Sequence, residues 1–250
     1  MWLAADYRAS LLPRKAPMKR ICRRVSAFAI ATALTFGLAA PAVAATPAAT
    51  SFANGRNPVI LVHGFIENGT MWSALTQALL AEGYQDDQIT AVTYNTITQS
   101  NVVTADQLGR TVQDLLRRTG ASKVDIVSHS MGSLNSRYCV KFAGCAGRTD
   151  HWVSIAGANL GTQGASLCSF LITCREMLPG STVLTKLNAD PVLPAGTKWS
   201  TLWTPSDGVI IPATNTVLPG ATNTEFDNLN HLNIFKDPSV IGKVKELLAS

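Results

Sequence analysis

The chain has 250 residues, with 21 basic and 16 acidic side chains, a formal net charge of +5 and 46% hydrophobic residues. Seven of the basic residues and one of the acidic residues lie in residues 1–44, which leaves 14 basic and 15 acidic side chains, a net charge of −1, in the other 206 residues. That balance argues against nucleic acid or an anionic surface as a partner, and 206 residues suffice for one domain with a substantial core.

Residues 1–44 have the pattern of a secretory signal peptide. A basic segment precedes an apolar run over residues 25–40, and small residues follow as far as Ala44. The apolar run is shorter than the roughly 20 residues that a membrane span needs. We therefore expect cleavage after Ala44 and secretion of the rest of the chain.

The remaining sequence predicts a loose leader over residues 45–57 and a single domain over residues 58–250. In the domain, short apolar runs typical of buried strands alternate with segments of helical periodicity. Strands are predicted over residues 58–62, 89–94, 124–127, 151–156 and 198–203 and near 224–227, and helices over 71–81, 102–119, 131–142, 181–188 and 237–248. Such alternation indicates an α/β fold, a parallel sheet covered by helices on both faces.

Four cysteines follow the predicted signal peptide, namely Cys139, Cys145, Cys168 and Cys174. An even number of cysteines in an exported chain indicates two disulfides. Of the three pairings, the two local ones, Cys139–Cys145 and Cys168–Cys174, are favoured because each closes a small loop. Neither pair has the Cys-x-x-Cys spacing of a zinc site, and no metal or organic cofactor is expected.

Residues 123–132 predict a buried strand that turns abruptly into a helix, with Ser130 at the turn. Ser128 and Gly132 are small residues two places on either side, which lets the strand and the helix pass close together. Such a turn is a nucleophile elbow, in which a strained serine exposes its hydroxyl at the edge of the sheet. The usual pattern has glycine in place of Ser128. The alternative is an ordinary strand–helix turn with an N-capping serine.

A serine hydroxyl becomes a good nucleophile only beside a base that a third group orients. In the elbow type of site the chain order is serine, acid and histidine, and His151 and His231 are the histidines that follow Ser130. His151 opens a predicted strand, so we interpret it as structural. His231 lies in a polar turn between the last predicted strand and the last helix, and it is the predicted base.

Asp207 is the predicted acid. It follows the strand over residues 198–203, at a carboxyl end where ligand sites of parallel sheets form. Asp190 and Asp227 are its competitors, and each is more simply interpreted as a turn former.

The negative oxygen of a tetrahedral intermediate needs two preorganised N–H donors, an oxyanion hole. The expected donors are the backbone N–H groups of Met131, directly after the nucleophile, and of Phe65, in the loop after the first strand. His63 is expected to shape that loop, and His129 is expected to pack beneath the elbow.

In this order, the motifs resemble those of the compact secreted bacterial lipases and esterases of the α/β-hydrolase superfamily. Residues 58–65, 123–132 and 206–210 carry the resemblance, which spans residues 57–248. It implies an α/β-hydrolase fold, a mostly parallel central sheet with helices on both faces, in a minimal form without a large cap. It also implies a secreted, monomeric serine hydrolase of triacylglycerol or other lipid esters that works through an acyl-enzyme and makes transient contact with lipid droplets.

Two other classes of function stay open at this point. The same triad would serve an acyltransferase or a hydrolase of cutin-like or synthetic polyesters. A non-catalytic binding module on the fold usually lacks a member of the triad, whereas all three residue types are present in this chain.

The connection over residues 157–180 is longer than most connections in compact domains. Because Cys168 and Cys174 lie in it, we expect it to form a fixed rim along one side of an acyl pocket and not a mobile lid.

Overall fold

The computed structural model describes residues 54–250, so the predicted signal peptide and the predicted leader up to residue 53 lie outside the described residues. The strands within this range are β1 (Val59–Val62), β2 (Ile89–Ala91), β3 (Val124–His129), β4 (Thr149–Ile155), β5 (Lys198–Trp203) and β6 (Thr222–Glu225). The α-helices are α1 (Ser73–Ala81), α2 (Asn101–Thr119), α3 (Met131–Phe142), α4 (Ile172–Met177), α5 (Thr182–Asn188) and α6 (Pro238–Leu248).

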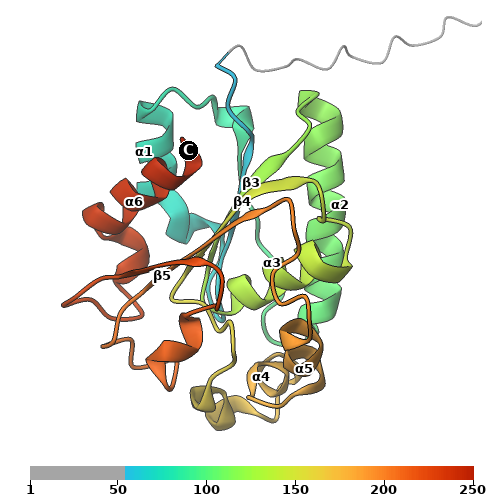
Figure 1. The fold of residues 1–250 in the computed structure, drawn as a ribbon, viewed down its shortest axis with the longest axis vertical. Coiled ribbons are helices and arrows are strands. Elements are labelled where there is room, and N and C mark those ends of the chain that lie inside the picture. The colour runs from blue at the N-terminus through green and yellow to red at the C-terminus, as the bar shows by residue number, and fades with distance from the viewer. Residues whose placement is uncertain (1–53) are drawn as a thin grey trace, which may run out of the picture. The chain divides into compact units, whose positions relative to one another are not determined.

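The six strands form one parallel sheet in the order β2-β1-β3-β4-β5-β6. Figure 1 shows α1 and α6 on one face of this sheet and α2 and α3 on the other. A parallel sheet covered on both faces is the predicted architecture, and the structure confirms it. Because the strands are parallel, their carboxyl ends all lie at the same end of the sheet, and the loops that follow them meet there.

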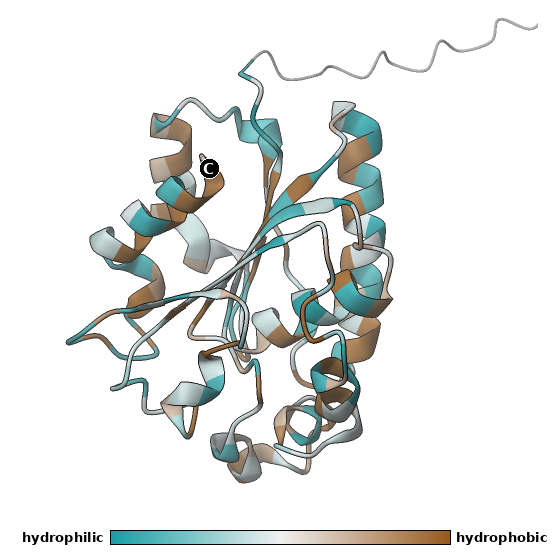
Figure 2. Cartoon of the chain, in the orientation of Figure 1, coloured by the Kyte–Doolittle hydropathy of each residue, from teal (hydrophilic) through white to brown (hydrophobic). Residues whose placement is uncertain are grey.

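Two apolar cores hold the three layers together. Val59 and Leu61 of β1 pack toward α1 and α6, while Ile60 and Val62 pack toward α2 and α3. Successive side chains of a strand point to opposite faces, so a strand buried on both faces is apolar at every position. Figure 2 shows hydrophobic and hydrophilic bands along α2, as expected for a helix with one buried side.

Most predicted bounds agree with the structure to within two residues. The second strand was predicted over residues 89–94, but β2 ends at Ala91. Beyond it, the N–H of Tyr94 donates to the ring of His63, at 3.3 Å from Nε2, instead of to the main chain of β1. The N–H of Val92 still donates to the carbonyl oxygen of Leu61, so the main-chain bonding to β1 gives way to a side-chain acceptor only at Tyr94, which an apolar run in the sequence does not reveal.

The long connection over residues 157–180 is ordered by its own secondary structure. It contains a 3-10 helix over Gln163–Cys168 and helix α4, neither of which was predicted. Cys174 and Met177 pack with Met131 and Leu134 of α3 in a third apolar cluster. This packing supports the expectation of a fixed rim.

The structure contains both local disulfides, Cys139–Cys145 and Cys168–Cys174, which is the pairing that the spacing favoured. Cys139 lies in α3 and Cys145 lies in the loop before β4, while the second bond links the 3-10 helix to α4. No helix between residues 54 and 250 is long and apolar enough to cross a bilayer.

Candidate active site

Ser130 lies between the end of β3 and the start of α3, with φ 54° and ψ −125°. A non-glycine residue at positive φ is strained, and such strain is common at functional sites. The turn is this tight because α3 approaches β1 closely. A Cβ at Gly132 would collide with the main-chain oxygens of Val62 and His63, so the residue two places after Ser130 has to be glycine.

Ser128 fits where the usual elbow has glycine, because its hydroxyl has partners on both neighbouring elements. Its Oγ lies 3.2 Å from the carbonyl oxygen of Val153 in β4 and 3.1 Å from the hydroxyl of Ser133 in α3. The buried hydroxyl can therefore donate to the first and accept from the second. Serine in place of the usual glycine therefore leaves no buried hydroxyl without a hydrogen-bond partner.

The structure brings Ser130, His231 and Asp207 into one hydrogen-bonded series. The ring of His231 has its Nε2 at 2.9 Å from Ser130 Oγ. Its Nδ1 lies 2.9 Å from Asp207 Oδ2. Both distances suit a base that takes a proton from the hydroxyl while the carboxylate fixes its tautomer.

The carboxylate of Asp207 is held in place by its own loop. Its Oδ1 accepts hydrogen bonds from the backbone N–H groups of Val209 at 3.0 Å and Ile210 at 2.6 Å. The N–H of His231 in turn donates to the carbonyl oxygen of Asp207 at 3.0 Å. The competing carboxylates of Asp190 and Asp227 make no hydrogen bond to the His231 ring in the described part of the chain.

Burial lowers the pKa of His231 below its ordinary value, although the hydrogen bond with Asp207 acts in the opposite direction. Removing the ring from water disfavours its charged form. The imidazole is therefore neutral near pH 7 and able to accept a proton.

The two predicted oxyanion donors both lie next to Ser130. Phe65 lines the same pocket as Ser130, and Met131 begins α3, where the partial positive charge of the helix lies. Within residues 54–250, neither backbone N–H has a hydrogen-bond acceptor in the protein. Both are free to donate to an oxygen of a bound substrate.

A pocket of about 290 Å³ opens beside Ser130. Its lining is mostly apolar, and one wall comes from the long connection over residues 157–180. The residues that line it are Phe65, Ser130, Thr162, Gly164, Ala165, Leu167, Cys168, Met177, Val209 and Ile210. An activated hydroxyl beside an apolar pocket suits attack on a carbonyl whose substituent is a hydrocarbon chain.

His63 has the structural role that the sequence suggested. Its Nδ1 lies 2.8 Å from the carbonyl oxygen of Gly64, and its ring stacks on Tyr94 with centroids 4.1 Å apart. Burial lowers the pKa of His63. A neutral ring with the proton on Nδ1 satisfies both contacts, because Nε2 then accepts from the N–H of Tyr94.

Glu67 is the residue at this site that the sequence reasoning missed. Its carboxylate accepts from the N–H of Gly64 and lies 3.0 Å from Nδ1 of His129. The expectation that His129 packs beneath the elbow is therefore only part of its role. Glu67 lies in a polar turn, 62 positions before His129 in the sequence, so no local pattern links the two.

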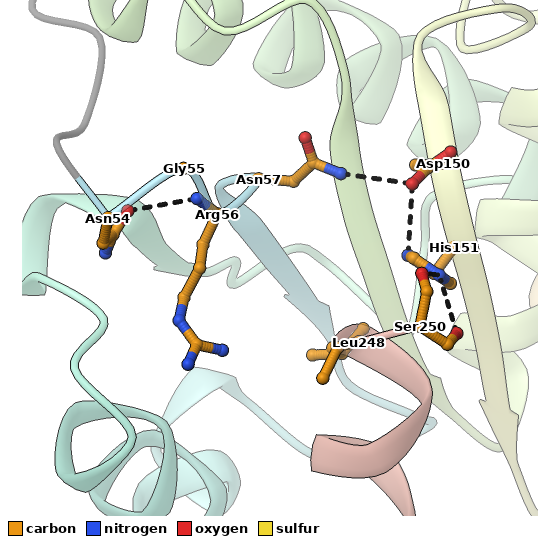
Figure 3. Close-up of a pocket in the computed structure, with 9 residues that line it drawn as sticks. Asn54, Gly55, Arg56, Asn57, Asp150, His151, Leu248 and Ser250 are labelled. Atoms are coloured by element: carbon orange, nitrogen blue, oxygen red, sulfur yellow. Dashed lines mark hydrogen bonds and ion pairs between the residues drawn. The ribbon is translucent and has the colours of Figure 1, made fainter.

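His151 lies near the start of β4, at the opposite end of the sheet from Ser130. Figure 3 shows it beside a second, more polar pocket of about 350 Å³, with Asn57, Asp150 and Ser250 around it. The lining of this pocket includes no elbow or oxyanion loop. The ring of His151 contacts Asp125 through one nitrogen and the main-chain oxygen of Ser250 through the other, so its interpretation as structural agrees with these contacts.

Comparison with known proteins places these motifs in a family. The sequence matches the family described as Lipase (class 2) over residues 56–243. A triacylglycerol lipase from Burkholderia plantarii is 32% identical over 133 residues, which are 50% of this chain and 37% of that protein. The match thus spans little more than a third of this curated relative.

Solved structures are similar in fold at much lower identity. The mature lipase BlEst2 of Bacillus licheniformis superposes with a TM-score of 0.66 at 17% identity, over 77% of this chain and 92% of that one. Lipase B of Aspergillus fumigatus gives a TM-score of 0.67 at 15% identity, over 82% of this chain and 55% of that one. These similarities confirm the predicted α/β-hydrolase fold.

Proposed function

The chain belongs to the class 2 lipase family, and from this premise we propose that it hydrolyses lipid esters with Ser130 as the nucleophile, His231 as the base and Asp207 as the orienting acid. The observation that carries the proposal is the pair of 2.9 Å contacts that join these three side chains. An acyl-enzyme mechanism follows from that arrangement.

In the first half-reaction, Ser130 Oγ attacks the ester carbonyl carbon while Nε2 of His231 takes the hydroxyl proton. Asp207 stabilises the resulting imidazolium through Nδ1. The N–H groups of Phe65 and Met131 donate to the oxyanion. His231 then gives its proton to the departing alcohol oxygen, and the acyl group stays on Ser130.

In the second half-reaction, a water molecule takes the place of the alcohol. His231 removes a proton from this water as its oxygen attacks the acyl carbon. Collapse of the second tetrahedral intermediate returns the proton to Ser130 Oγ and releases the carboxylic acid. Each of the two attacks needs the neutral imidazole that the burial of His231 favours.

The size of the apolar pocket supports an acyl chain as its occupant. Its volume of about 290 Å³ is at the lower end of the range for small-molecule sites, which begins near 300 Å³. One acyl chain would occupy it, while the alcohol part of the ester stays outside. Triacylglycerols and simpler esters both meet this requirement.

Secretion is part of the proposal. Disulfides form in oxidising compartments, and the two in this structure accord with export of the chain. Sequencing the N-terminus of the exported protein tests whether cleavage follows Ala44.

The decisive assay uses the purified mature protein on a series of p-nitrophenyl esters and triacylglycerols of increasing acyl length. Hydrolysis that depends on acyl length supports an ester hydrolase with an acyl pocket. Adding a primary alcohol tests the acyltransferase alternative, since a transferase gives mainly the new ester and little free acid. Absence of hydrolysis of every ester would refute the proposed function.

A further inference from the structure

A buried acid–histidine pair lies directly behind the proposed triad and takes no part in the mechanism above. His129 precedes Ser130 in the chain and is fully buried. Its Nδ1 lies 3.0 Å from Glu67 Oε2, and its Nε2 lies 3.0 Å from the main-chain oxygen of His231. The ring therefore bridges the loop after β1 and the loop that carries the base.

Glu67 extends this bridge to the oxyanion loop. The same Oε2 atom accepts a hydrogen bond of 2.6 Å from the N–H of Gly64, the residue before the proposed donor Phe65. A Cβ on Gly64 would lie 2.6 Å from Glu67 Oε2 and 2.8 Å from the Cβ of Ser130. Gly64 is thus packed between the carboxylate and the nucleophile, so a displaced Glu67 would displace the oxyanion loop.

The acceptors around His129 determine where its protons lie. A carbonyl oxygen only accepts, so Nε2, which faces His231 O, carries a proton. At Nδ1, a bare lone pair 3.0 Å from an ionised carboxylate would be repelled, so a second proton lies between Nδ1 and Glu67 Oε2. The pair is neutral as a whole, and each of its hydrogen bonds is made.

The carboxylate of Glu67 favours its ionised form. Burial of Glu67 opposes its ionisation, but the hydrogen bond from His129 and the charge of that ring outweigh burial and lower the pKa of Glu67. Of the titratable groups in the described residues, Glu67 hydrogen-bonds to the ring of His129, the ring of His231 packs against it, and His63 interacts with its charge. Phe235 packs against the ring with centroids 4.9 Å apart and adds no charge.

Both hydrogen bonds that the pair makes to other residues end on, or next to, a proposed reacting group. Gly64 adjoins the donor Phe65, His129 adjoins Ser130, and the carbonyl belongs to His231 itself. We propose that Glu67 and His129 are positioning residues, which fix the oxyanion loop, the nucleophile elbow and the His231 loop relative to one another. This inference rests on the proposed ester hydrolysis.

The first test removes the charge of Glu67 with little change in shape, by Glu67→Gln. We expect kcat for a soluble ester to fall by about tenfold to a hundredfold, because small displacements of reacting groups cost that much. KM should change by less than about twofold, since the acyl pocket is untouched. Glu82→Gln is the matched control, because Glu82 also has a charged partner, Lys245 at 2.6 Å, but lies on the surface. It should keep full activity.

A double-mutant cycle tests whether Glu67 and His129 act together or affect kcat independently. If Glu67 and His129 act through one chain of bonds, the Glu67→Gln/His129→Gln protein should be no slower than the slower single variant. In His129→Gln, loss of the positive ring raises the pKa of His231. The acid limb of kcat/KM should then move to higher pH, an effect that a purely structural role does not produce.

The protonation of His129 can also be measured directly by NMR, so that the test does not depend on activity that a misfolded variant would lose. In ¹⁵N NMR spectra of the Ser130→Ala protein near pH 7, both ring nitrogens of His129 should carry protons. In the Ser130→Ala/Glu67→Gln protein, one of them should not. Wild-type kcat and an unshifted pH profile in both single variants, or a singly protonated His129 beside an intact Glu67, would overturn this proposal alone. Absence of hydrolysis by the wild type would overturn the proposed function and this proposal with it.

Discussion

Two histidine–aspartate pairs of the same geometry lie at opposite ends of the sheet, one where the strands end and one where they begin. In each, the ring Nδ1 is 2.9 Å from a buried carboxylate oxygen, of Asp207 for His231 and of Asp125 for His151. Ser250 even places its Oγ 3.3 Å from Nε2 of His151. A hydrogen-bonded series of serine, histidine and aspartate therefore occurs twice in the described part of the chain.

The surroundings of the second ring nitrogen distinguish the two pairs. Nε2 of His231 faces a serine on a strained elbow, with an apolar pocket and two free N–H groups beside it. Nε2 of His151 lies 3.1 Å from the main-chain oxygen of Ser250 and 3.2 Å from the amine of Lys198. Among residues 54–250, the hydrogen bonds of this ring involve Asp125, Ser250 and Lys198, and none comes from a backbone N–H group. A histidine–aspartate contact alone therefore indicates a satisfied histidine, and the elbow is what indicates catalysis.

The largest expected difference is between the two serines. Ser130→Ala should reduce ester hydrolysis to background, a loss of about a million-fold in kcat, because no other hydroxyl occupies the elbow. Ser250→Ala should keep wild-type kcat. Steady-state kinetics of both variants, with circular dichroism as the check on folding, decide the matter. Substantial activity in Ser130→Ala would show that Ser130 is not the nucleophile.

The two aspartates should differ next. Asp207→Asn should lower kcat by about ten-thousandfold, because the amide favours the wrong tautomer of His231. Asp125→Asn removes the same kind of contact from His151 and should lower the free energy of unfolding while leaving kcat near wild type. Kinetics and urea unfolding separate the two effects. If Asp190→Asn or Asp227→Asn were the inactive variant, Asp207 would not be the acid.

A pH profile sharpens the comparison further. Activity requires neutral His231, so kcat/KM should be lost as pH falls through the pKa of that ring, which burial holds below the ordinary 6.5. The unfolded chain binds protons at higher pH than the buried rings of His231 and His63 do, so the free energy of unfolding should also fall below about pH 6.5. Half-maximal kcat/KM at pH 7 or above would contradict this account.

The connection over residues 157–180, which we expect to be a fixed rim beside Ser130, contains a disulfide that can be removed. Replacing Cys168 and Cys174 together by serine should lower the free energy of unfolding by about 2 kcal/mol, because the bond closes only a small loop. Turnover of a short, soluble ester should change far less, since no proposed triad residue lies in the rim. Loss of activity with unchanged stability would show that the rim acts in the chemistry.

The smallest effect concerns the unusual first position of the elbow. Ser128→Ala removes the hydroxyl that lies between Val153 and Ser133, and should cost about 1 kcal/mol of unfolding free energy. Activity should stay near wild type, because Ala still fits the turn. A large loss of kcat would mean that the Ser128 hydroxyl helps to shape the elbow.

Much of the fold was readable from local patterns. A strand buried on both faces has to be apolar throughout, and residues 58–62 satisfy that condition at every position. The elbow also has a local signature, since Gly132 is required by backbone contacts that any such turn makes. The chain order of serine, acid and histidine then pointed to Asp207 and His231, the two residues that contact each other at 2.9 Å.

The features that escaped prediction depend on contacts distant in sequence. Glu67 resembles a turn residue until the fold brings His129 to it. Beyond the early end of β2, the N–H of Tyr94 bonds to the ring of His63, which lies 31 positions earlier. Helix α4 has only six residues, too few to show a helical period, so its place in the rim follows from the apolar cluster around Met131 and Leu134 and not from its own sequence.

The most direct test of the central claim is to label the mature protein with a p-nitrophenyl alkylphosphonate and to locate the adduct by peptide mass spectrometry. A phosphonate reacts with the activated serine and stays attached, as a mimic of the tetrahedral intermediate. We expect one adduct per chain, on Ser130, with hydrolysis lost in proportion to labelling and no adduct in Ser130→Ala. An adduct on Ser250, or full hydrolytic activity after Ser130 is labelled, would contradict this claim.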